Sequence, residues 1–327
     1  MVSRPSGTNL FLPLPCFFQM ENIHPDIKIE EVTNPVRAGY SKTQAYIKLT
    51  KFKLSFLVVL SAVISYFTLC GEINIAKIIA ITIGGFLVTG AANGFNQVIE
   101  KNLDKLMTRT SARPLPQNIL SSAQALIFCF IMVAAGIFVL GYWVNVLSGI
   151  LGALSVVLYA LVYTPLKRKT PFSVFVGAFP GAIPTLIGGV AASNGFGEFS
   201  FHAWLLFAVQ FMWQFPHFWA IAWVSHDDYR KAGFFMLPSL GGRDKSSAFQ
   251  IVVYTIFLIP VSILPQVFGL ANYISGIFVI LFGIFFLIQA LTLYLKVDIQ
   301  SARKLMFGSF IYLPLVQLCI MFGALWK

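Results

Sequence analysis

The 327 residues combine many apolar side chains with few charges: 57% are hydrophobic, 15% aromatic and 11% charged. A soluble domain has about 25% charged residues, so this composition excludes an ordinary soluble protein. Lys and Arg outnumber Asp and Glu by 23 to 12, which gives a net charge of +11. In a membrane protein such an excess gathers in cytoplasmic loops, so we expect no nucleic-acid partner.

The first 45 residues are predicted to form a polar, disordered tail ahead of one folded domain at 46–327. The tail's apolar stretch, LFLPLPCFF, is too short and too rich in proline to span a bilayer, and it lacks a signal-peptide cleavage pattern. Met20 begins a more ordinary polar start, MENIHPDIKIEE. The native chain therefore starts at Met1 or at Met20, which an N-terminal mass measurement would decide.

Nine apolar runs follow, each about as long as the helix that crosses a bilayer. They lie near residues 54–70, 75–96, 119–140, 143–163, 173–192, 202–224, 248–267, 272–294 and 304–325. We therefore predict an all-α, polytopic membrane protein. Its nine transmembrane helices would surround a central apolar cavity, with the lipid bilayer around them.

The cations occur in alternate loops, which predicts the orientation. Groups of Lys and Arg stand before the first span and after every even-numbered span, whereas the opposite loops carry almost none. These groups are Arg37, Lys42, Lys48, Lys51 and Lys53; Lys101, Lys105, Arg109 and Arg113; Lys167, Arg168 and Lys169; Arg230, Lys231, Arg243 and Lys245; and Lys296, Arg303 and Lys304. By the positive-inside rule, the N-terminus and these loops are cytoplasmic and the C-terminus is outside.

Two acidic stretches lie on this predicted cytoplasmic side. The segment Asn93–Pro116 holds Asn96, Glu100 and Asp104 at intervals of four residues, so on a helix they share one face. The second stretch, Ser225–Gly233, follows the sixth span and reads SHDDYRKAG. The two stretches are four spans apart, as two parallel-related halves of one chain would place them.

Carboxylates held together at a membrane edge repel each other unless a cation joins them. Mg²⁺ suits oxygen ligands and binds through a few carboxylates plus substrate phosphates. Neighbouring Arg and Lys side chains would bind the remaining phosphate oxygens. These groups beside an apolar cavity suit an amphiphile with a diphosphate head, such as a prenyl diphosphate. A set of loop salt bridges explains the spacing alone about equally well.

The sixth span contains Gln214, Pro216 and His217 among many aromatic residues. A polar side chain inside a membrane span is by default a functional candidate, although a His bonded to a neighbouring helix is the plainer alternative. The aromatic residues could line a site for a flat macrocycle, and His is a common axial ligand of haem iron. The cations of YTPLKRKT, which include Lys167, either mark topology or bind phosphate or propionate.

These motifs together resemble the protohaem IX farnesyltransferase family, one branch of the UbiA-type intramembrane prenyltransferases, from about Tyr46 to the last span. The stretch NQVIEKNLDKLMTRTSARPL is similar to the family's first motif, with Glu100 and Asn102 where the family has Asp. One anionic ligand is therefore missing. The stretch WQFPHFWAIAWVSHDDYRKAGFFMLP resembles the family's most specific signature, which separates it from relatives that prenylate hydroxybenzoate or naphthoate.

The resemblance implies transfer of a farnesyl group from farnesyl diphosphate to a vinyl group of haem B, giving haem O for haem–copper terminal oxidases. It implies Mg²⁺ as the cofactor, and the bacterial inner membrane rather than the mitochondrial one. Haem A synthase or a terminal oxidase assembly is a candidate protein partner. The implied site residues are Glu100, Asp104 and Asp228 in catalysis; Glu100, Asp104, Asp227 and Asp228 at the metal; Asn96, Arg109, Arg113, Lys167 and Lys231 at the diphosphate; and His217 at haem.

Two other functions stay open. The first is an aromatic polyprenyltransferase of quinone synthesis, against which the WQFPHFW signature argues. Incubation with haem and with hydroxybenzoate would separate the two. The second is a membrane transporter, because intramembrane His residues and paired repeats also occur there. Release of diphosphate that depends on Mg²⁺ would exclude a transporter.

Overall fold

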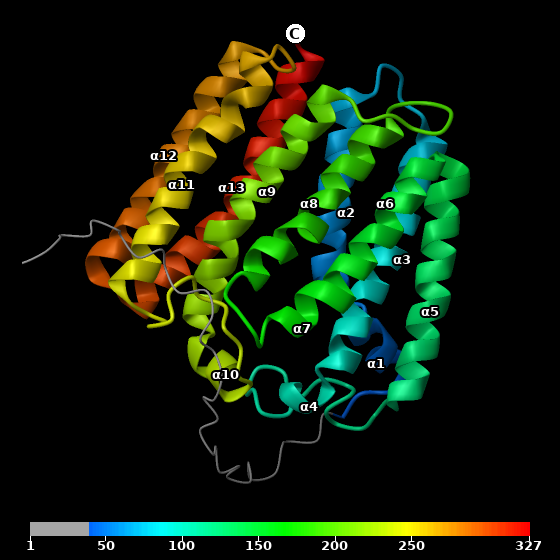
Figure 1. Cartoon of the computed structure of the whole chain (residues 1–327). Helices are drawn as coiled ribbons and strands as arrows, with labels where there is room; N and C mark the ends of the chain where they lie inside the picture. Colours follow the sequence, from blue (N-terminus) through cyan, green and yellow to red (C-terminus); the bar gives the residue numbers. More distant parts are fainter. Residues whose placement is uncertain (1–38) are drawn as a thin grey trace, which may run out of the picture. The chain divides into compact units, whose positions relative to one another are not determined.

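The computed structural model describes residues 39–327, and every regular element within that range is helical (Figure 1). Most of the predicted tail, including both candidate start residues, Met1 and Met20, lies outside the described residues. Helix α1 (Lys42–Leu49) already begins within the last part of the predicted tail. Its start is a capping box, in which Ser41 and Gln44 each accept a hydrogen bond from the other's backbone N–H.

Nine long helical segments follow α1 in the described part of the chain, one for each predicted span. They are α2 (Phe52–Leu69), α3 (Ile75–Ile99), α5 (Ser122–Val139) with the π-helical η1 (Leu140–Val144), α6 (Val146–Val156) with the π-helical η2 (Val157–Tyr163) and α7 (Thr164–Leu166), α8 (Ser173–Ala191), α9 (Phe201–Val224), α11 (Lys245–Val267), α12 (Tyr273–Lys296) and α13 (Ile299–Leu325). Two short helices, α4 (Lys101–Asp104) and α10 (His226–Lys231), follow α3 and α9.

Eight of these segments are long and apolar enough to cross a membrane, so the chain is an all-helical, multi-pass membrane protein. The remaining segment is α9, which has 24 residues but carries four Trp residues together with Gln210, Gln214 and His217. These side chains lower its hydropathy, although α9 packs against α8, α11 and α13. A ninth crossing by α9 and a cytoplasmic N-terminus stay predictions.

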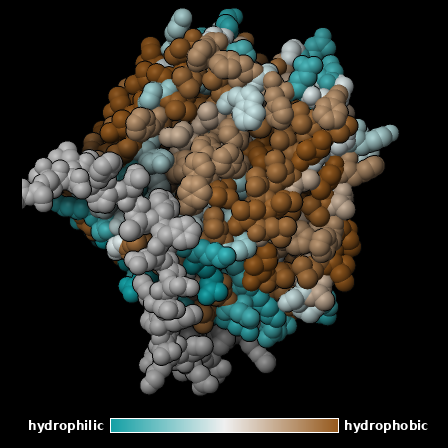
Figure 2. All heavy atoms as spheres, viewed as in Figure 1, coloured by the Kyte–Doolittle hydropathy of each residue, from teal (hydrophilic) through white to brown (hydrophobic). Residues whose placement is uncertain are grey.

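The short helices gather at one end of the bundle. Figure 1 shows α4, α7 and α10 at its lower end, whereas the C-terminus lies at the opposite end. We call the end formed by α4, α7 and α10 the polar end. In Figure 2 hydrophobic side chains cover the flank of the long helices, and hydrophilic ones gather below them at the polar end. Large apolar side chains such as Ile131 on α5 and Phe285 on α12 are exposed, as expected for helices that face lipid.

Small residues set the closest helix contacts. Where α2 crosses α8, a Cβ atom on Gly188 would overlap the backbone carbonyl oxygen of Ala62. In the same contact, Ser65 Oγ donates a hydrogen bond of 2.6 Å to the carbonyl of Thr185. Without a hydrophobic drive between helices in lipid, such close approach and interhelical hydrogen bonds hold membrane helices together.

We expect the substitution Gly188→Ala to destabilise the protein by about 1–3 kcal/mol, because the new methyl group meets backbone that must shift. Gly71→Ala is the matched control, since its Cβ would meet no atom within 4 Å. Thermal unfolding of the detergent-solubilised protein measures both. Equal melting temperatures for the two variants would contradict this packing account.

Candidate active site

The predicted ladder lies where α3 ends and α4 begins. Glu100 separates the two helices, but helical spacing continues because Glu100 N donates to Asn96 O (2.9 Å) and Asp104 N donates to Glu100 O (2.8 Å). The three side chains are buried, with exposed fractions of 3%, 4% and 0% for Asn96, Glu100 and Asp104. Asn102, where the family has Asp, is exposed instead. This departure therefore does not alter the buried pair of carboxylates.

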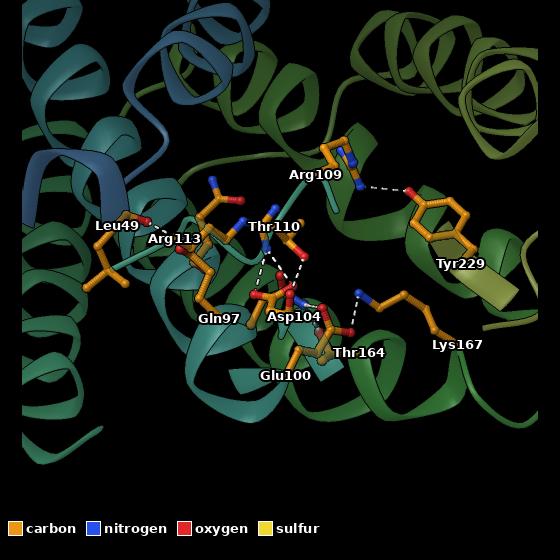
Figure 3. A network of polar contacts seen from close by, with 12 residues as sticks. Leu49, Gln97, Glu100, Asp104, Arg109, Thr110, Arg113, Thr164, Lys167 and Tyr229 are labelled. Atoms are coloured by element: carbon orange, nitrogen blue, oxygen red, sulfur yellow. Dashed lines mark hydrogen bonds and ion pairs between the residues drawn. The ribbon is translucent and has the colours of Figure 1, made fainter. Parts of the chain in front are cut away.

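Each of the two buried carboxylates has a cationic partner (Figure 3). Arg113 donates from one guanidinium nitrogen to both oxygens of Asp104, at 2.9 and 2.8 Å. Lys167 reaches from beyond α7, and its ammonium lies 2.5 Å from Glu100 Oε1. Asn96 Nδ2 donates to the other oxygen of Glu100, Oε2, at 2.9 Å. The end of α3, α4 and the turn after α7 are thus joined by charge.

The second acidic stretch joins the same region through the loop that follows α4. Asp228 on α10 accepts hydrogen bonds from the backbone N–H groups of Thr108 (3.2 Å) and Arg109 (3.0 Å). Lys231 lies 3.4 Å from the same carboxylate. Burial acts to raise the pKa of Asp228, but these backbone and side-chain donors together hold it below its ordinary value. The carboxylate is therefore stabilised in its charged form.

Tyr229 adds a second link between α10 and the loop after α4. Arg109 donates to its hydroxyl at 3.4 Å and lies over its ring, 5.6 Å from the centroid. In Figure 3 Tyr229 reaches toward Arg109 while Lys167 points toward Glu100 below it. Burial raises the pKa of the Tyr229 hydroxyl, so it remains a neutral donor and acceptor at this edge of the site.

Asp227, another predicted metal ligand, differs from its neighbour Asp228 in its surroundings. Its side chain is 72% exposed and pairs with Arg243 at 3.0 Å, on a different side of α10 from Asp228. Within residues 39–327, no three His, Cys, Asp or Glu side chains are grouped so that they could hold a metal ion. Mg²⁺, however, usually binds one or two carboxylates and completes its shell with water and substrate phosphates. Glu100 and Asp104, one turn apart, fit that requirement.

Lys51 also belongs to this region, although the sequence marked it only as one of several topology cations. It lies between α1 and α2 with φ 48°, in the left-handed region that non-glycine residues seldom adopt. Its ammonium is close enough to Glu100, Asp104, Arg113 and Lys167 to interact with their charges. Nothing in the local sequence signals this position, since it depends on the break between two helices.

His217 lies apart from the carboxylates, inside α9. It is seven residues before the end of that helix, or about 10 Å along its axis. Its Nδ1 is 2.8 Å from Ser309 Oγ on α13, and the ring of Trp213 stacks on it with a centroid distance of 4.1 Å. The neighbouring Gln214 donates to the carbonyl of Ala178 on α8 at 2.9 Å. These polar groups are held between three helices of the bundle.

Two cavities lie between the long helices. One, of about 20 Å³, lies between α2, α3, η1, α6 and α8, and most of its walls are apolar, formed by residues such as Val59, Val88 and Ile187. The other, of about 10 Å³, lies between α2, α8, α9 and α13 and carries Ser61, Thr185 and other polar residues in its wall. Each has room for about one water molecule, and the first is the more apolar of the two.

Comparison with known proteins points to one family. Residues 55–313 match the model of the UbiA prenyltransferase family. The chain is similar to a protoheme IX farnesyltransferase of Cytophaga hutchinsonii, with 43% identity over 279 residues that cover 85% of this chain and 96% of that protein. It is also similar to one of Christiangramia forsetii, with 46% identity over 276 residues that cover 83% of this chain and 90% of that protein.

Solved structures share its fold. A structure described as digeranylgeranylglyceryl phosphate synthase has a TM-score of 0.72 at 20% identity, and the match covers 88% of this chain and 99% of that one. A UbiA homolog from Archaeoglobus fulgidus bound to GPP and Mg²⁺ has a TM-score of 0.64 at 14% identity, covering 86% of this chain and 99% of that one. At these identities the similarity concerns the arrangement of helices.

The buried ion pair between Asp104 and Arg113 should matter for stability. Arg113→Ala would leave a fully buried carboxylate without a partner, so we expect a loss of about 3–5 kcal/mol. Asp227→Asn removes an ion pair that is largely exposed, and its cost should be about 0–1 kcal/mol. Thermal unfolding in detergent compares the two. A loss for Arg113→Ala no larger than that for Asp227→Asn would mean that water reaches Asp104.

The low pKa of Asp228 predicts how its contribution to stability depends on pH. A carboxyl whose folded pKa is depressed stabilises the protein above its ordinary value of 3.8, and this stabilisation is lost as the pH falls through the folded pKa. The difference in stability between wild type and Asp228→Asn should therefore be constant at neutral pH and vanish only in acid below pH 3.8. Unfolding in denaturant, measured across this range, checks it. A difference that disappears nearer pH 6 would contradict the assignment.

Proposed function

The chain belongs to the UbiA prenyltransferase family, and from this premise we propose that it transfers the farnesyl group of farnesyl diphosphate to a vinyl group of haem B (protohaem IX), giving haem O. The observation that carries the proposal is the matching of charges at the polar end. Each of Glu100, Asp104 and Asp228 has a cationic partner, which is Lys167, Arg113 or Lys231.

This matching suits a site that binds a diphosphate together with a metal ion. The three acids and their three partners cancel, and the guanidinium of Arg109 adds one positive charge beside them. A fully ionised prenyl diphosphate carries three negative charges and Mg²⁺ carries two positive ones, so the pair brings about one negative charge to the site. The charge of Arg109 offsets it.

The same cations can serve two sets of partners. Without substrate they neutralise the buried carboxylates, which could not stay charged alone in an apolar bundle. When the carboxylates face a metal ion, Arg113 and Lys167 are free to turn to the phosphate oxygens. Arg113 would do so with the planar fork that suits phosphate, and Lys167 as a point charge.

Glu100 and Asp104 are the proposed Mg²⁺ ligands, and Asn96 holds the orientation of Glu100 through its 2.9 Å hydrogen bond. Asp228 on α10 is not grouped with them in residues 39–327 and would have to approach them when the metal ion binds. When bound, Mg²⁺ supplies Lewis-acid stabilisation of the departing diphosphate. A protein of the same fold, the UbiA homolog from Archaeoglobus fulgidus, is described as bound to GPP and Mg²⁺, which supports a prenyl diphosphate and Mg²⁺ as ligands of this fold. Asp227 is left out of the set, because it is exposed and paired with Arg243.

The reaction begins with loss of the diphosphate, which takes the electron pair of the bond between carbon and oxygen. Arg109, Arg113, Lys167 and Lys231 stabilise the negative charge that builds on the departing oxygens. The π-electrons of the haem vinyl group then form the new carbon–carbon bond with the farnesyl cation. Water adds to the carbon left positive and loses a proton, which completes the hydroxyethyl group. The surrounding apolar side chains keep other water away from the farnesyl cation.

We propose that the farnesyl chain lies between α2, α3, α6 and α8, where the apolar cavity of about 20 Å³ would have to widen to admit it. Thr89 in its wall is seven residues before Asn96 on α3, so the cavity lies about 10 Å along that helix from the proposed metal site. A chain entering it would leave its diphosphate at the polar end. His217 would position haem from the other side of the bundle, on α9.

We place the enzyme in the bacterial inner membrane with its polar end in the cytoplasm, because the cations gather on that side. Its product would then pass to haem A synthase or to a terminal oxidase assembly.

The test is expression in a host that lacks its own haem O synthesis, followed by haem extraction and mass analysis. We expect haem O from the wild-type chain and at least about 100-fold less from Glu100→Gln, since one of the two carboxylates proposed to hold Mg²⁺ would be lost, and with it the metal's stabilisation of the leaving group. Glu198→Gln is the control and should leave the yield unchanged, because Glu198 lies in the loop between α8 and α9, which Figure 1 shows at the opposite end of the bundle from α4 and α10.

Haem B that stays unmodified, with prenylation of hydroxybenzoate by the purified protein, would favour a quinone-precursor prenyltransferase instead. An undiminished yield from Glu100→Gln would refute the metal site and leave the transfer itself intact.

A further inference from the structure

His217 is held by a set of contacts that the carboxylate site does not use. Its Nδ1 lies 2.8 Å from Ser309 Oγ. Trp213 stacks on the ring with an interplanar angle of 18°, and its indole nitrogen donates to the backbone carbonyl of Ser309 at 2.9 Å. Phe310 meets the ring edge-on with a centroid distance of 5.1 Å. The ring's plane and position are therefore fixed from two helices, α9 and α13.

The hydrogen bonds of Ser309 favour one tautomer of His217. A serine hydroxyl has one hydrogen, and the carbonyl of Met306 lies 2.6 Å from Ser309 Oγ, where it can accept that hydrogen. A hydroxyl that donates to Met306 can only accept from His217, and Nδ1 is then the protonated nitrogen. In the neutral ring, which burial between two apolar helices favours, Nε2 carries an unshared electron pair.

That second nitrogen has no hydrogen bond to any residue in the range 39–327. The two Gln side chains of α9 are paired: Gln210 donates to the carbonyl of Gly181 and accepts from Gln317, and Gln214 donates to the carbonyl of Ala178. The indole nitrogens of Trp219 and Trp223 are, like Nε2, without a partner. Unlike those N–H groups, Nε2 of the Nδ1–H ring carries an unshared electron pair, so it can bind a metal ion.

We propose that Ser309 is a positioning residue that holds His217 as the Nδ1–H tautomer, so that Nε2 can donate its electron pair to the iron of haem B. This rests on the proposed function, which makes haem B the acceptor. The arrangement is the one that metal-binding histidines use, in which the nitrogen away from the metal donates to a fixed acceptor. No electrons are transferred, since the step forms only a bond between nitrogen and iron.

The position of the pair within the membrane supports this assignment. His217 lies about 10 Å from the polar end of α9, and Ser309 is ten residues, or about 15 Å, from the start of α13. A flat macrocycle bound to Nε2 would thus lie deeper than the diphosphate group, on the apolar side of it. An electrophilic carbon held beside the polar end and a vinyl group held deeper can meet between the two.

The tautomer can be tested without any substrate. Histidine labelled with ¹⁵N in the ring and built into the full chain in lipid nanodiscs gives separate signals for protonated and bare nitrogens, with His217→Gln to assign them. We expect Nδ1 to be protonated and Nε2 bare. A protonated Nε2 in the neutral ring would overturn the proposal.

Titration with ferric haem B, followed by its Soret band and without farnesyl diphosphate, tests the bond to iron. Wild type should show the spectrum of a nitrogen-ligated haem, and His217→Ala should lose it. Ser309→Ala should bind haem B about 10- to 100-fold more weakly, the usual effect of removing a group that orients a metal ligand.

Iron-free protoporphyrin IX is the control for folding and packing, because it cannot use Nε2. Its affinity should be the same for wild type and Ser309→Ala. Equal losses for both porphyrins would show that Ser309 only supports the packing, and would overturn the proposal. Haem O made at the normal rate by Ser309→Ala without any nitrogen-ligated spectrum would also overturn it, while the transferase function would stand. If the wild type showed the spectrum of a nitrogen-ligated haem but made no haem O, the proposed role of Ser309 and His217 would stand and the proposed transferase function would be refuted.

Discussion

The pairing of buried acids with cations is the constraint on which the polar end of the bundle depends. Glu100 and Asp104 are almost entirely removed from water, and an ionised carboxylate in such a place needs a partner that compensates for lost solvation. Lys167 and Arg113 supply it from two different segments of the chain. The pairs therefore fix how the end of α3, the loop after α4 and the turn after α7 lie together. Asp228 extends this network to α10.

The same constraint explains why such a site can be both stable and reactive. Charges that balance one another in the free protein are already gathered where a metal ion and a diphosphate would need them, so binding exchanges partners rather than creating charge in an apolar surrounding. Preorganised cations of this kind contribute most to a reaction in which negative charge develops on a leaving group. The stabilising network and the proposed catalytic one are thus formed by the same side chains.

Much of this arrangement could be predicted from the sequence, because it depends on residue spacing. Intervals of four residues predicted that Asn96, Glu100 and Asp104 share one face of a helix, and apolar runs predicted the long helices. Adjacent residues are harder to tell apart: Asp227 and Asp228 differ by about 100° around α10, and only the fold decides that one faces Arg243 and the other the site. Lys51 and Ser309 could not be found, since each acts on residues far away in the chain.

The bundle also separates two kinds of polar group by depth. In the described part of the chain, the paired charges of the site lie at the polar end, where water can still reach some of them, whereas α9 and α13 carry neutral groups such as Gln210, Gln214 and Ser309 inside the bundle, hydrogen-bonded to backbone carbonyls. This is what an apolar medium requires, because a charge there costs far more than a paired amide or hydroxyl. A reaction in which an ionised head group departs and an apolar chain joins a flat, largely apolar acceptor needs the same gradient. The unpaired Nε2 of His217 lies among the neutral groups inside the bundle. A bare cation would be costly there, whereas the iron of haem, already bound by its macrocycle, can bind.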